Sequence, residues 1–468
     1  MAESSSAATA STSTSGATAP PVLSQAGTKT KLGGYDFYRE VLGSPKYVVA
    51  PMVDQSELAF RILCRRYGAD LAYTPMINAH VFPYYPIKQQ DKAFDVREGE
   101  EGNPALDRPL VVQFCTNNPE ELLASARIVE AHCDAVDINL GCPQDIAKKG
   151  HYGSYLQDEW DLVYKLVNTL HENLSVPVTA KFRIFTDPER TLAYAKMLER
   201  AGAQILTVHG RTREQRGVNT GLADWKQIAM IKKAVSVPVF ANGNMLYQED
   251  VEACLQATGA DGVMSAEGLL YNPALFAGLG RSSVDPAHSA PIHLHLPATQ
   301  LALEYLSICR SINTHTSLGA IRGHLFKILR PALVRHTDLR ERLGRANVKD
   351  KGKGWWKVRG QEGGLGAYEE IVGELEERLK ADMEVHPDAS ITSADPETGL
   401  KDVPWWLTQP YVRPLPEVHP KSSATLRDRL IAMQSRRLAA SEEQSAEIQF
   451  DLSALEGLAD GKMVDVSA

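Results

Sequence analysis

Eight short runs of apolar and β-branched residues recur within residues 47–265, and a polar or glycine-rich turn follows nearly every run. Between the runs lie amphipathic stretches of helical character, among them 57–67, 119–132, 189–201 and 248–257. Eight strands that alternate with helices over this length predict an α/β fold, a (β/α)8 TIM barrel. A doubly wound sheet is the alternative, but no GxGxxG follows the first run. The runs are Tyr47–Met52, Leu71–Met76, Leu110–Phe114, Ala135–Leu140, Val176–Phe182, Ile205–His209, Val237–Ala241 and Gly262–Ser265.

Polar residues gather where these runs end. In a barrel of this class the chemistry lies at the C-terminal ends of the strands, because the loops that follow the strands meet at one face. Seven of the eight runs end in unusual polar or glycine-rich residues, so we expect one site there. These residues are Pro51-Met52, Gln113, Asn139 with Gly141-Cys142-Pro143, Lys181 with Arg183, His209-Gly210-Arg211, Asn242-Gly243-Asn244 and Ala266-Glu267-Gly268.

The composition of the regions outside the eight runs predicts how the rest of the chain is organised. Residues 1–30 hold 7 Ser, 6 Thr and 7 Ala, too little apolar surface to offset the entropy of ordering. We therefore expect a disordered tail over 1–34, the barrel over 35–290 and a C-terminal all-helical domain over 291–360. Residues 361–468 are expected to form a polar, largely flexible extension. An amphipathic stretch at 426–438 within it is either a docking helix or a solvated helix.

Charge and cysteine content narrow the function classes. The net charge of −8 argues against a generally basic nucleic-acid binder, but residues 322–359 hold 12 Lys/Arg against 3 Asp/Glu. Lys327, Arg330 and Arg335 in that segment are the expected phosphate contacts. Six cysteines without a CxxC pair argue against a disulfide scaffold and a metal site. The chain has no apolar run of 18 residues, so we expect no membrane span. It also has no recognisable organelle signal, so we expect a cytoplasmic or nuclear protein.

Five ordered motifs resemble those of the tRNA-dihydrouridine synthase family, over roughly residues 45–335. The last motif is similar to the eukaryotic branch that modifies positions 16 and 17 of the tRNA D-loop. The resemblance implies an FMN-dependent reduction of uridine to 5,6-dihydrouridine in tRNA, with NADPH as the reductant and NADH as the alternative. The motifs are Ala50-Pro51-Met52-Val53-Asp54, Asp137 to Gln144, Val208 to Arg213, Ala241-Asn242-Gly243-Asn244, and Ser265-Ala266-Glu267-Gly268 followed by Tyr271-Asn272-Pro273.

The resemblance assigns one group of strand-end residues to the flavin ring. It implies that the backbone of Pro51, Met52 and Val53 lines the ring, and that Gln113, Lys181 and His209 are FMN ligands. Elementary chemistry agrees for Lys181, because a fixed ammonium stabilises an anionic reduced ring. A lysine at a strand end can also extend its ammonium to solvent, which is the alternative.

A second group is assigned to the flavin phosphate. Loops after the seventh and eighth strands of such barrels cradle phosphates with backbone N–H groups. In this chain those loops are Asn242-Gly243-Asn244 and Ala266-Glu267. Many members of the family have Gly-Arg where this chain has Ala266-Glu267, so a side-chain cation is missing here.

Cys142 is the candidate catalytic residue, because it lies in a polar loop at the catalytic face. A thiol with a pKa of about 8.5 is mostly protonated near neutrality, as a general acid requires. The family role is that acid: hydride passes from flavin N5 to uracil C6, and the thiol protonates C5. Asn139, Arg183 and Arg211 are the expected substrate contacts. Arg213 is a candidate too, with a surface ion pair as its alternative.

Two other functions stay open at this stage. A free-pyrimidine or dihydroorotate-type flavin oxidoreductase would use a similar barrel and cysteine, although the basic helical segment favours tRNA as the partner. A non-catalytic tRNA-binding chaperone would need neither Lys181 nor Cys142. The sequence indicates no oligomeric state.

Overall fold

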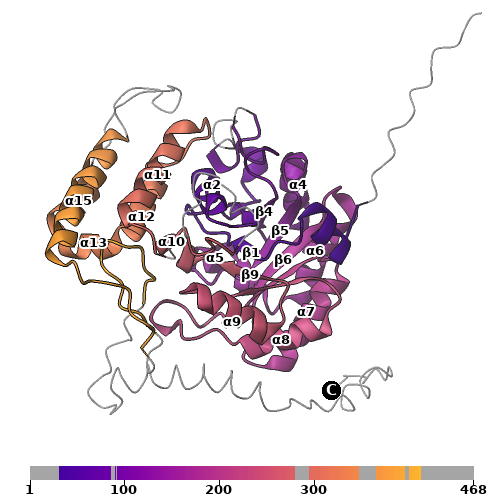
Figure 1. Cartoon of the computed structure of the whole chain (residues 1–468). Helices are drawn as coiled ribbons and strands as arrows, with labels where there is room; N and C mark the ends of the chain where they lie inside the picture. The colour runs from indigo at the N-terminus through magenta and orange to yellow at the C-terminus, as the bar shows by residue number, and fades with distance from the viewer. Residues whose placement is uncertain are drawn as a thin grey trace, which may run out of the picture. The chain divides into compact units, whose positions relative to one another are not determined.

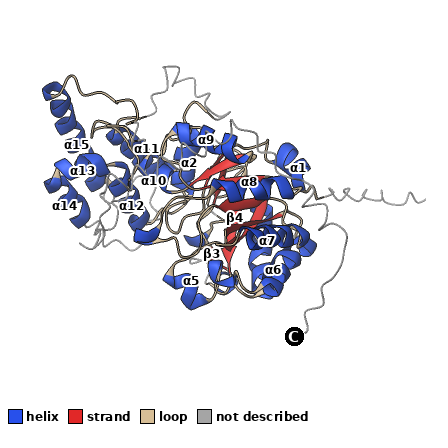
Figure 2. Ribbon diagram, turned by 90° about the horizontal axis from the view of Figure 1, so that it is seen from below, coloured by secondary structure: helices blue, strands red, loops and turns tan. Residues whose placement is uncertain are grey.

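The computed structural model describes residues 31–85, 90, 92–97, 99–279, 295–346, 365–395 and 400–412. Parallel strands close into a barrel that helices surround (Figures 1 and 2), so the predicted (β/α)8 fold is confirmed. Neighbouring strands follow the order β2-β1-β9-β8-β7-β6-β5-β4, and pairing of β2 with β4 closes the ring. The barrel strands are β1 (Tyr47–Val49), β2 (Leu71–Tyr73), β4 (Leu110–Cys115), β5 (Ala135–Leu140), β6 (Val178–Arg183), β7 (Leu206–His209), β8 (Val239–Asn242) and β9 (Gly262–Ser265).

The second predicted run is divided in the structure. β2 ends at Tyr73, and the short β3 (Ile77–Asn78) continues along β4, where Ile77 lies opposite Phe114. Pro75 separates the two pieces, because proline has no N–H to donate to a strand ladder. The other strands differ from the predicted runs only at their ends.

Helices cover the outside of the barrel, and capping side chains define where several of them begin. The side chains of Asn118, Asp187 and Asp224 accept hydrogen bonds from the first N–H groups of α4, α7 and α8. Pro119 and Pro188 occupy the first turn, where no N–H is needed. The helices are α2 (Leu58–Arg66), α4 (Pro119–Val129), α6 (Trp160–Asn173), α7 (Pro188–Arg200), α8 (Trp225–Ala234), α9 (Gln248–Thr258) and the short α10 (Glu267–Tyr271).

The N-terminal end of the barrel is filled by apolar side chains. The π-helix η1 (Phe37–Val41) places Phe37 and Tyr38 in one buried cluster with Val48, Phe240 and Met264. Residues farther along the same faces of the strands are polar. The polar interior is therefore confined to the C-terminal end, where the sequence predicts the site.

Helices also follow the barrel in the described part of the chain. Helix α11 (Ala298–Ser311) packs against α2 and against α15 (Gly366–Val385), while α12 (Leu318–Ile328) packs against α10. The apolar spacing over 318–335 predicts one continuous helix. In the structure α12 ends at Ile328, and a second helix, α13 (Arg330–Arg335), follows it. Pro331 explains the break, because it lacks an N–H and is tolerated only in a first turn. Helix α14 (Thr337–Arg345) follows.

A long helix lies within the extension predicted over 361–468. Helix α15 lies beyond residue 360 and buries Tyr368, Ile371, Val372, Leu375 and Leu379, which recur at helical spacing and pack towards α11. The helical region thus extends farther than the expected boundary.

The segment 400–412 returns to the barrel. Leu407 bridges to Pro297, the hydroxyl of Thr408 donates to Asn272 Oδ1 at 3.1 Å, and the ring of Tyr411 stacks on Tyr271. The predicted tail at 1–30, the basic residues 347–359 and the amphipathic stretch 426–438 lie outside the described residues.

Candidate active site

Strand register brings the predicted polar residues together in three layers. Gln113 lies opposite Asp137, and Asp137 lies opposite Thr179. One step closer to the C-terminal face, Asn139 lies opposite Lys181. The third layer places His209 between its strand neighbours Arg183 and Asn242. Strand residues alternate between faces, so these side chains share the inward face with the buried interior residues Val111, Ala135, Ile205 and Phe240.

Asp137 lies at the centre of the deepest layer, and the sequence analysis did not select it. Its side chain is fully buried and accepts hydrogen bonds from Gln113 Nε2 at 2.8 Å and from the hydroxyl of Thr179 at 2.6 Å. Burial raises the pKa of Asp137 to about 6, although both hydrogen bonds and Lys181 oppose the rise. A carboxylate at an inward position of a buried strand was the available signal, because such a charge needs partners.

Lys181 supplies a cation next to this layer. Burial, and next the Arg183 guanidinium, lower the pKa of Lys181 to about 8. The ammonium is therefore charged at neutral pH, and it forms no hydrogen bond or ion pair with another residue that the structure describes. Lys181 is only partly buried, and Asp137 is the one carboxylate among the described residues whose charges act on its pKa. An ammonium without a hydrogen bond in this interior suits a site that receives an anionic group.

His209 and Arg211 meet the loop after β8. Arg211 Nη1 lies 3.2 Å from His209 Nε2, and Arg211 Nη2 donates to Asn244 Oδ1 at 2.8 Å. Burial and the charges of Arg183, Lys181 and Arg211 lower the pKa of His209 well below its ordinary value, so the imidazole is neutral. Arg211 therefore places a cation beside the Asn242–Asn244 loop, whereas the position at which the family's arginine is missing is Ala266-Glu267 in the next loop.

The loop after β8 needs a glycine at this point. Gly243 has φ +121°, and an added Cβ would lie 2.7 Å from Ala223 Cβ and 3.3 Å from His209 Cδ2. Asn244 follows at φ +69°, while Asn242 Nδ2 donates to the Met264 carbonyl at 2.8 Å. The first turn of α10, just after β9, also packs closely against the segment after β8, because a Cβ at Gly268 would lie 2.3 Å from the Met245 carbonyl oxygen. Ala266 and Glu267 begin α10 there.

Cys142 is partly buried in the loop after β5, and its backbone is held on both sides. Its N–H donates to Asn139 Oδ1 at 2.9 Å, and its carbonyl accepts from the hydroxyl of Ser154 at 2.9 Å. Gly153 has φ +67° and approaches so closely that a Cβ would lie 2.7 Å from the Cys142 carbonyl oxygen. Burial raises the pKa of the Cys142 thiol, which keeps its proton at neutral pH. Cys115 lies in the same small apolar cluster.

The expected substrate-contacting arginines bond to loop backbone in this structure. Arg183 Nε donates to the Gly141 carbonyl at 2.9 Å, and Arg183 Nη1 donates to the Thr212 carbonyl at 2.9 Å. Arg213 pairs with Asp158 and Glu214. Their roles toward a substrate stay predictions. After β1, Pro51 and Met52 are partly buried while Val53 is 47% exposed.

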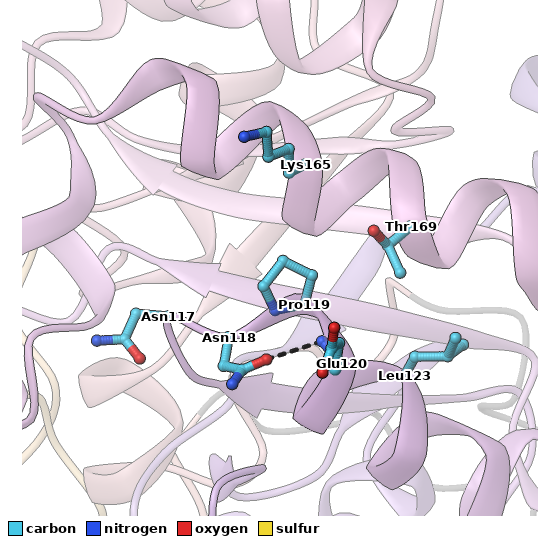
Figure 3. Close-up of a pocket in the computed structure, with 7 residues that line it drawn as sticks. All are labelled: Asn117, Asn118, Pro119, Glu120, Leu123, Lys165 and Thr169. Carbon is cyan, nitrogen blue, oxygen red and sulfur yellow. Dashed lines mark hydrogen bonds between the residues drawn. The ribbon is translucent and has the colours of Figure 1, made fainter.

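A separate depression lies between the start of α4 and α6 (Figure 3). It is lined by Asn117, Asn118, Pro119, Glu120, Leu123, Lys165 and Thr169, none of which belongs to the layers above. Asn118 Oδ1 is used to cap α4, accepting from the Glu120 N–H at 2.9 Å. The depression therefore adds nothing to the site.

The described residues define the ligand chemistry of the barrel mouth. A cation and amide groups lie in the interior, and a close-packed glycine loop with an arginine lies at the rim, which suits an elongated anionic ligand. No three His, Cys, Asp or Glu side chains among the described residues gather as a metal site would require. None of the helices in the described ranges is long and apolar enough to cross a membrane.

Comparisons with known proteins agree on one family. The profile described as "Dihydrouridine synthase (Dus)" matches residues 48–355. The tRNA-dihydrouridine(16/17) synthase of Schizosaccharomyces pombe is 45% identical over 394 residues, covering 82% of this chain and 92% of that protein. The protein of the same name from Saccharomyces cerevisiae is 46% identical over 401 residues, covering 84% and 90%. A human tRNA-dihydrouridine(20a/20b) synthase-like protein is 42% identical, but over 49% of this chain and 70% of its own length.

Proposed function

Because the chain belongs to the dihydrouridine synthase family, we propose that it reduces uridine to 5,6-dihydrouridine at positions 16 and 17 of the tRNA D-loop. The family makes it an oxidoreductase. The choice of positions is supported by coverage: relatives named for 16/17 align over 82% and 84% of this chain, against 49% for the relative named for 20a/20b. Their names include NAD(P)(+), which supports NADPH, or NADH, as the reductant.

The barrel mouth fits FMN. Lys181, whose ammonium makes no bond to other described residues, would lie at the anionic edge of the ring together with Gln113. The Asn242–Asn244 loop, the start of α10 at Ala266-Glu267, and neutral His209 would hold the phosphate. Arg211 would replace the cation that Glu267 does not supply. Bound FMN supplies the hydride that reduces C6 of uracil.

Cys142 would supply the proton to C5 of the same base. The raised pKa of its thiol keeps the proton in place at neutral pH, and the bonds to Asn139 and Ser154 hold its backbone at the mouth. The observation that carries the proposal is the strand register, which places the Asn139–Cys142 turn directly beside Lys181.

A half-reaction experiment tests this assignment. The purified protein, loaded with FMN, is reduced by NADPH without oxygen and then mixed with unmodified tRNA, and flavin reoxidation is followed by absorbance. Cys142→Ala should leave reduction by NADPH within about twofold of wild type, but slow reoxidation by tRNA about 10²–10⁴-fold, the usual worth of a positioned general acid.

Cys115→Ala is the matched control, because this thiol lies in the same cluster. It should react at the wild-type rate. Sequencing of the product tRNA then locates dihydrouridine. A protein that binds tRNA but neither binds FMN nor turns over would be the chaperone instead, and reduction of free uracil or orotate without tRNA affinity would identify the free-pyrimidine enzyme.

A further inference from the structure

The buried carboxylate of Asp137 begins a chain of hydrogen bonds that ends at Cys142. Gln113 Nε2 donates to Asp137 Oδ2 at 2.8 Å, and Asn139 Nδ2 donates to Gln113 Oε1 at 2.8 Å. Asn139 Oδ1 in turn accepts from the backbone N–H groups of Gly141 at 3.1 Å and Cys142 at 2.9 Å. Each link is a normal hydrogen bond.

The two groups that end this series of hydrogen bonds, the Asp137 carboxylate and the backbone N–H of Cys142, fix which atom donates and which accepts at every link. An amide side chain can present either its oxygen or its NH2 group, so Gln113 and Asn139 alone have two arrangements. An ionised carboxylate only accepts, so Gln113 must turn its NH2 group to Asp137 and its oxygen to Asn139. Asn139 then has its oxygen left for the two N–H groups, which can only donate. The reverse arrangement would set acceptor against acceptor at Asp137 and donor against donor at the Cys142 turn.

The other bonds of Asp137 do not compete with this role. Thr179 donates to the second carboxylate oxygen at 2.6 Å, and the Asp137 side chain is 0% exposed, so bulk solvent does not reach it. Lys181 is the titratable group whose charge lowers the pKa of Asp137, and the Asp137 charge in turn raises the pKa of Tyr73. The Cys142 backbone is held by Ser154 on its carbonyl side, so the Asp137 chain supplies the hold on its N–H side.

We propose that Asp137 is a positioning residue: it sets the orientation of the Gln113 and Asn139 amides and thereby holds the Cys142 thiol in place for proton transfer. The inference deepens the proposed function and rests on Cys142 as the acid. Positioning matters because a displacement of about 1 Å can cost about 10²-fold in rate.

Asp137→Leu keeps the branching of the side chain but replaces both acceptor oxygens with methyl groups, and it leaves the Gln113 amide free to turn. Asp137→Asn retains one oxygen for Gln113 if the Thr179 hydroxyl turns to accept, so it should be intermediate and serves if the leucine variant does not fold. Thr179→Val is the matched control, because it removes a donor to Asp137 but leaves the chain to Cys142 intact.

Two measurements are made on each variant. In the half-reaction assay, reoxidation by tRNA should fall about 10²-fold in Asp137→Leu. Reduction by NADPH should fall much less, by at most about tenfold, because Gln113 and Lys181 beside Asp137 also face the proposed flavin site. In the protein without cofactor, alkylation by iodoacetamide should become several-fold faster at Cys142, read by mass spectrometry. Cys309, also partly exposed, is the internal reference and should not change.

Several other results would contradict the positioning role of Asp137 or the role of Cys142. Equal losses in both half-reactions would place the effect of Asp137 on Lys181 and overturn the proposal, as would faster alkylation of Cys309 together with Cys142, or unchanged rates in both assays. If Cys142→Ala itself reacts with tRNA at the wild-type rate, the proposed acid is wrong. The alkylation result then still decides whether Asp137 positions this loop.

Discussion

At the scale of single residues, the Lys181 ammonium in the candidate site is an unfavourable charge for the folded protein. The barrel interior and the Arg183 guanidinium lower the pKa of Lys181 from 10.5 to about 8. A protonated lysine is thus less favoured in the folded chain than in the unfolded chain. Because the unfolded chain binds more protons between pH 8 and 10.5, the stability of the folded state rises with pH across that window.

Lys181→Met should therefore stabilise the protein without cofactor at pH 7. A gain of about 1 kcal/mol would raise the melting temperature by about 2–4 °C, and the gain should shrink as the pH approaches about 10. With saturating FMN the order should reverse, since ligand at about 100 times its Kd adds about 2.7 kcal/mol to the wild type only. Calorimetry at both pH values, with and without FMN, checks this. A lower melting temperature for the cofactor-free variant at pH 7 would contradict it.

The sequence predicted that these polar residues gather at one end of the barrel, but not how their side chains are arranged. Gln113, Asn139, Lys181 and His209 follow recognisable runs, and strand register brings them to one end of the barrel. The sequence does not predict amide orientations, which depend on contacts between different strands, and it left Asp137 unselected. It also could not show that Arg211 reaches Asn244, because the two are 33 residues apart.

At the scale of elements, strands were easier to predict than the helices that follow the barrel. β-branched runs bounded by turns define every barrel strand, whereas Pro75 and Pro331 interrupt two elements that apolar spacing alone would continue. The contacts between elements came only from the structure. Glu57 precedes α2 and accepts from the Tyr305 hydroxyl of α11 at 2.6 Å, and it lies 3.1 Å from His324 Nε2 of α12.

This cluster should carry much of the attachment between the barrel and α11–α12. Burial would raise the pKa of Glu57, but His324 and the hydrogen bonds outweigh burial and lower it. Its stabilisation is therefore present above the unfolded pKa and is lost as the pH falls through the folded value. At pH 7, Glu57→Gln should cost about 1.5–3 kcal/mol of unfolding free energy in urea. The difference should shrink as the pH falls below 4.5, the ordinary pKa of glutamate, and on through the lower folded value.

Glu369→Gln is the control for the Glu57 variant. It breaks an ion pair of 2.6 Å with Arg310 between α11 and α15, but both side chains are about one-third exposed. Such a pair contributes about 0–1 kcal/mol. A cost for Glu369→Gln as large as that for Glu57→Gln, or a Glu57 effect independent of pH, would show that the cluster does not act through its charge.

At the scale of the whole molecule, the cations chosen from the sequence prove to be engaged within the protein. The Lys327 ammonium donates to Gln55 Oε1. The guanidinium of Arg330 lies 4.2 Å from the ring centre of Tyr411, and that of Arg335 lies 3.4 Å from the ring centre of Trp405. These three residues attach the helices to the barrel rim and to segment 400–412. If they were substituted, weaker RNA binding could not be distinguished from damage to the structure.

Two other arginines of the same segment are better placed to bind RNA. Arg322 on α12 and Arg340 on α14 are exposed, and neither forms an ion pair with another described residue. Arg340 also lines a depression between α12 and α14. A folded tRNA spreads its phosphates far beyond one uracil, so much of the affinity should come from such cations outside the barrel.

Arg322→Gln with Arg340→Gln should weaken tRNA binding and lower the slope of log affinity against log salt by about 0.7–0.9 for each phosphate that is no longer neutralised. Reduction of the flavin by NADPH should not change, because neither residue lies among the strand-end layers. The control pair Arg330→Gln with Arg335→Gln should instead lower the melting temperature, since it removes two cation–ring interactions. Binding is measured by fluorescence anisotropy at several salt concentrations. An unchanged slope in the first pair, with a reduced slope in the second, would move the RNA surface from α12–α14 to the face that segment 400–412 borders.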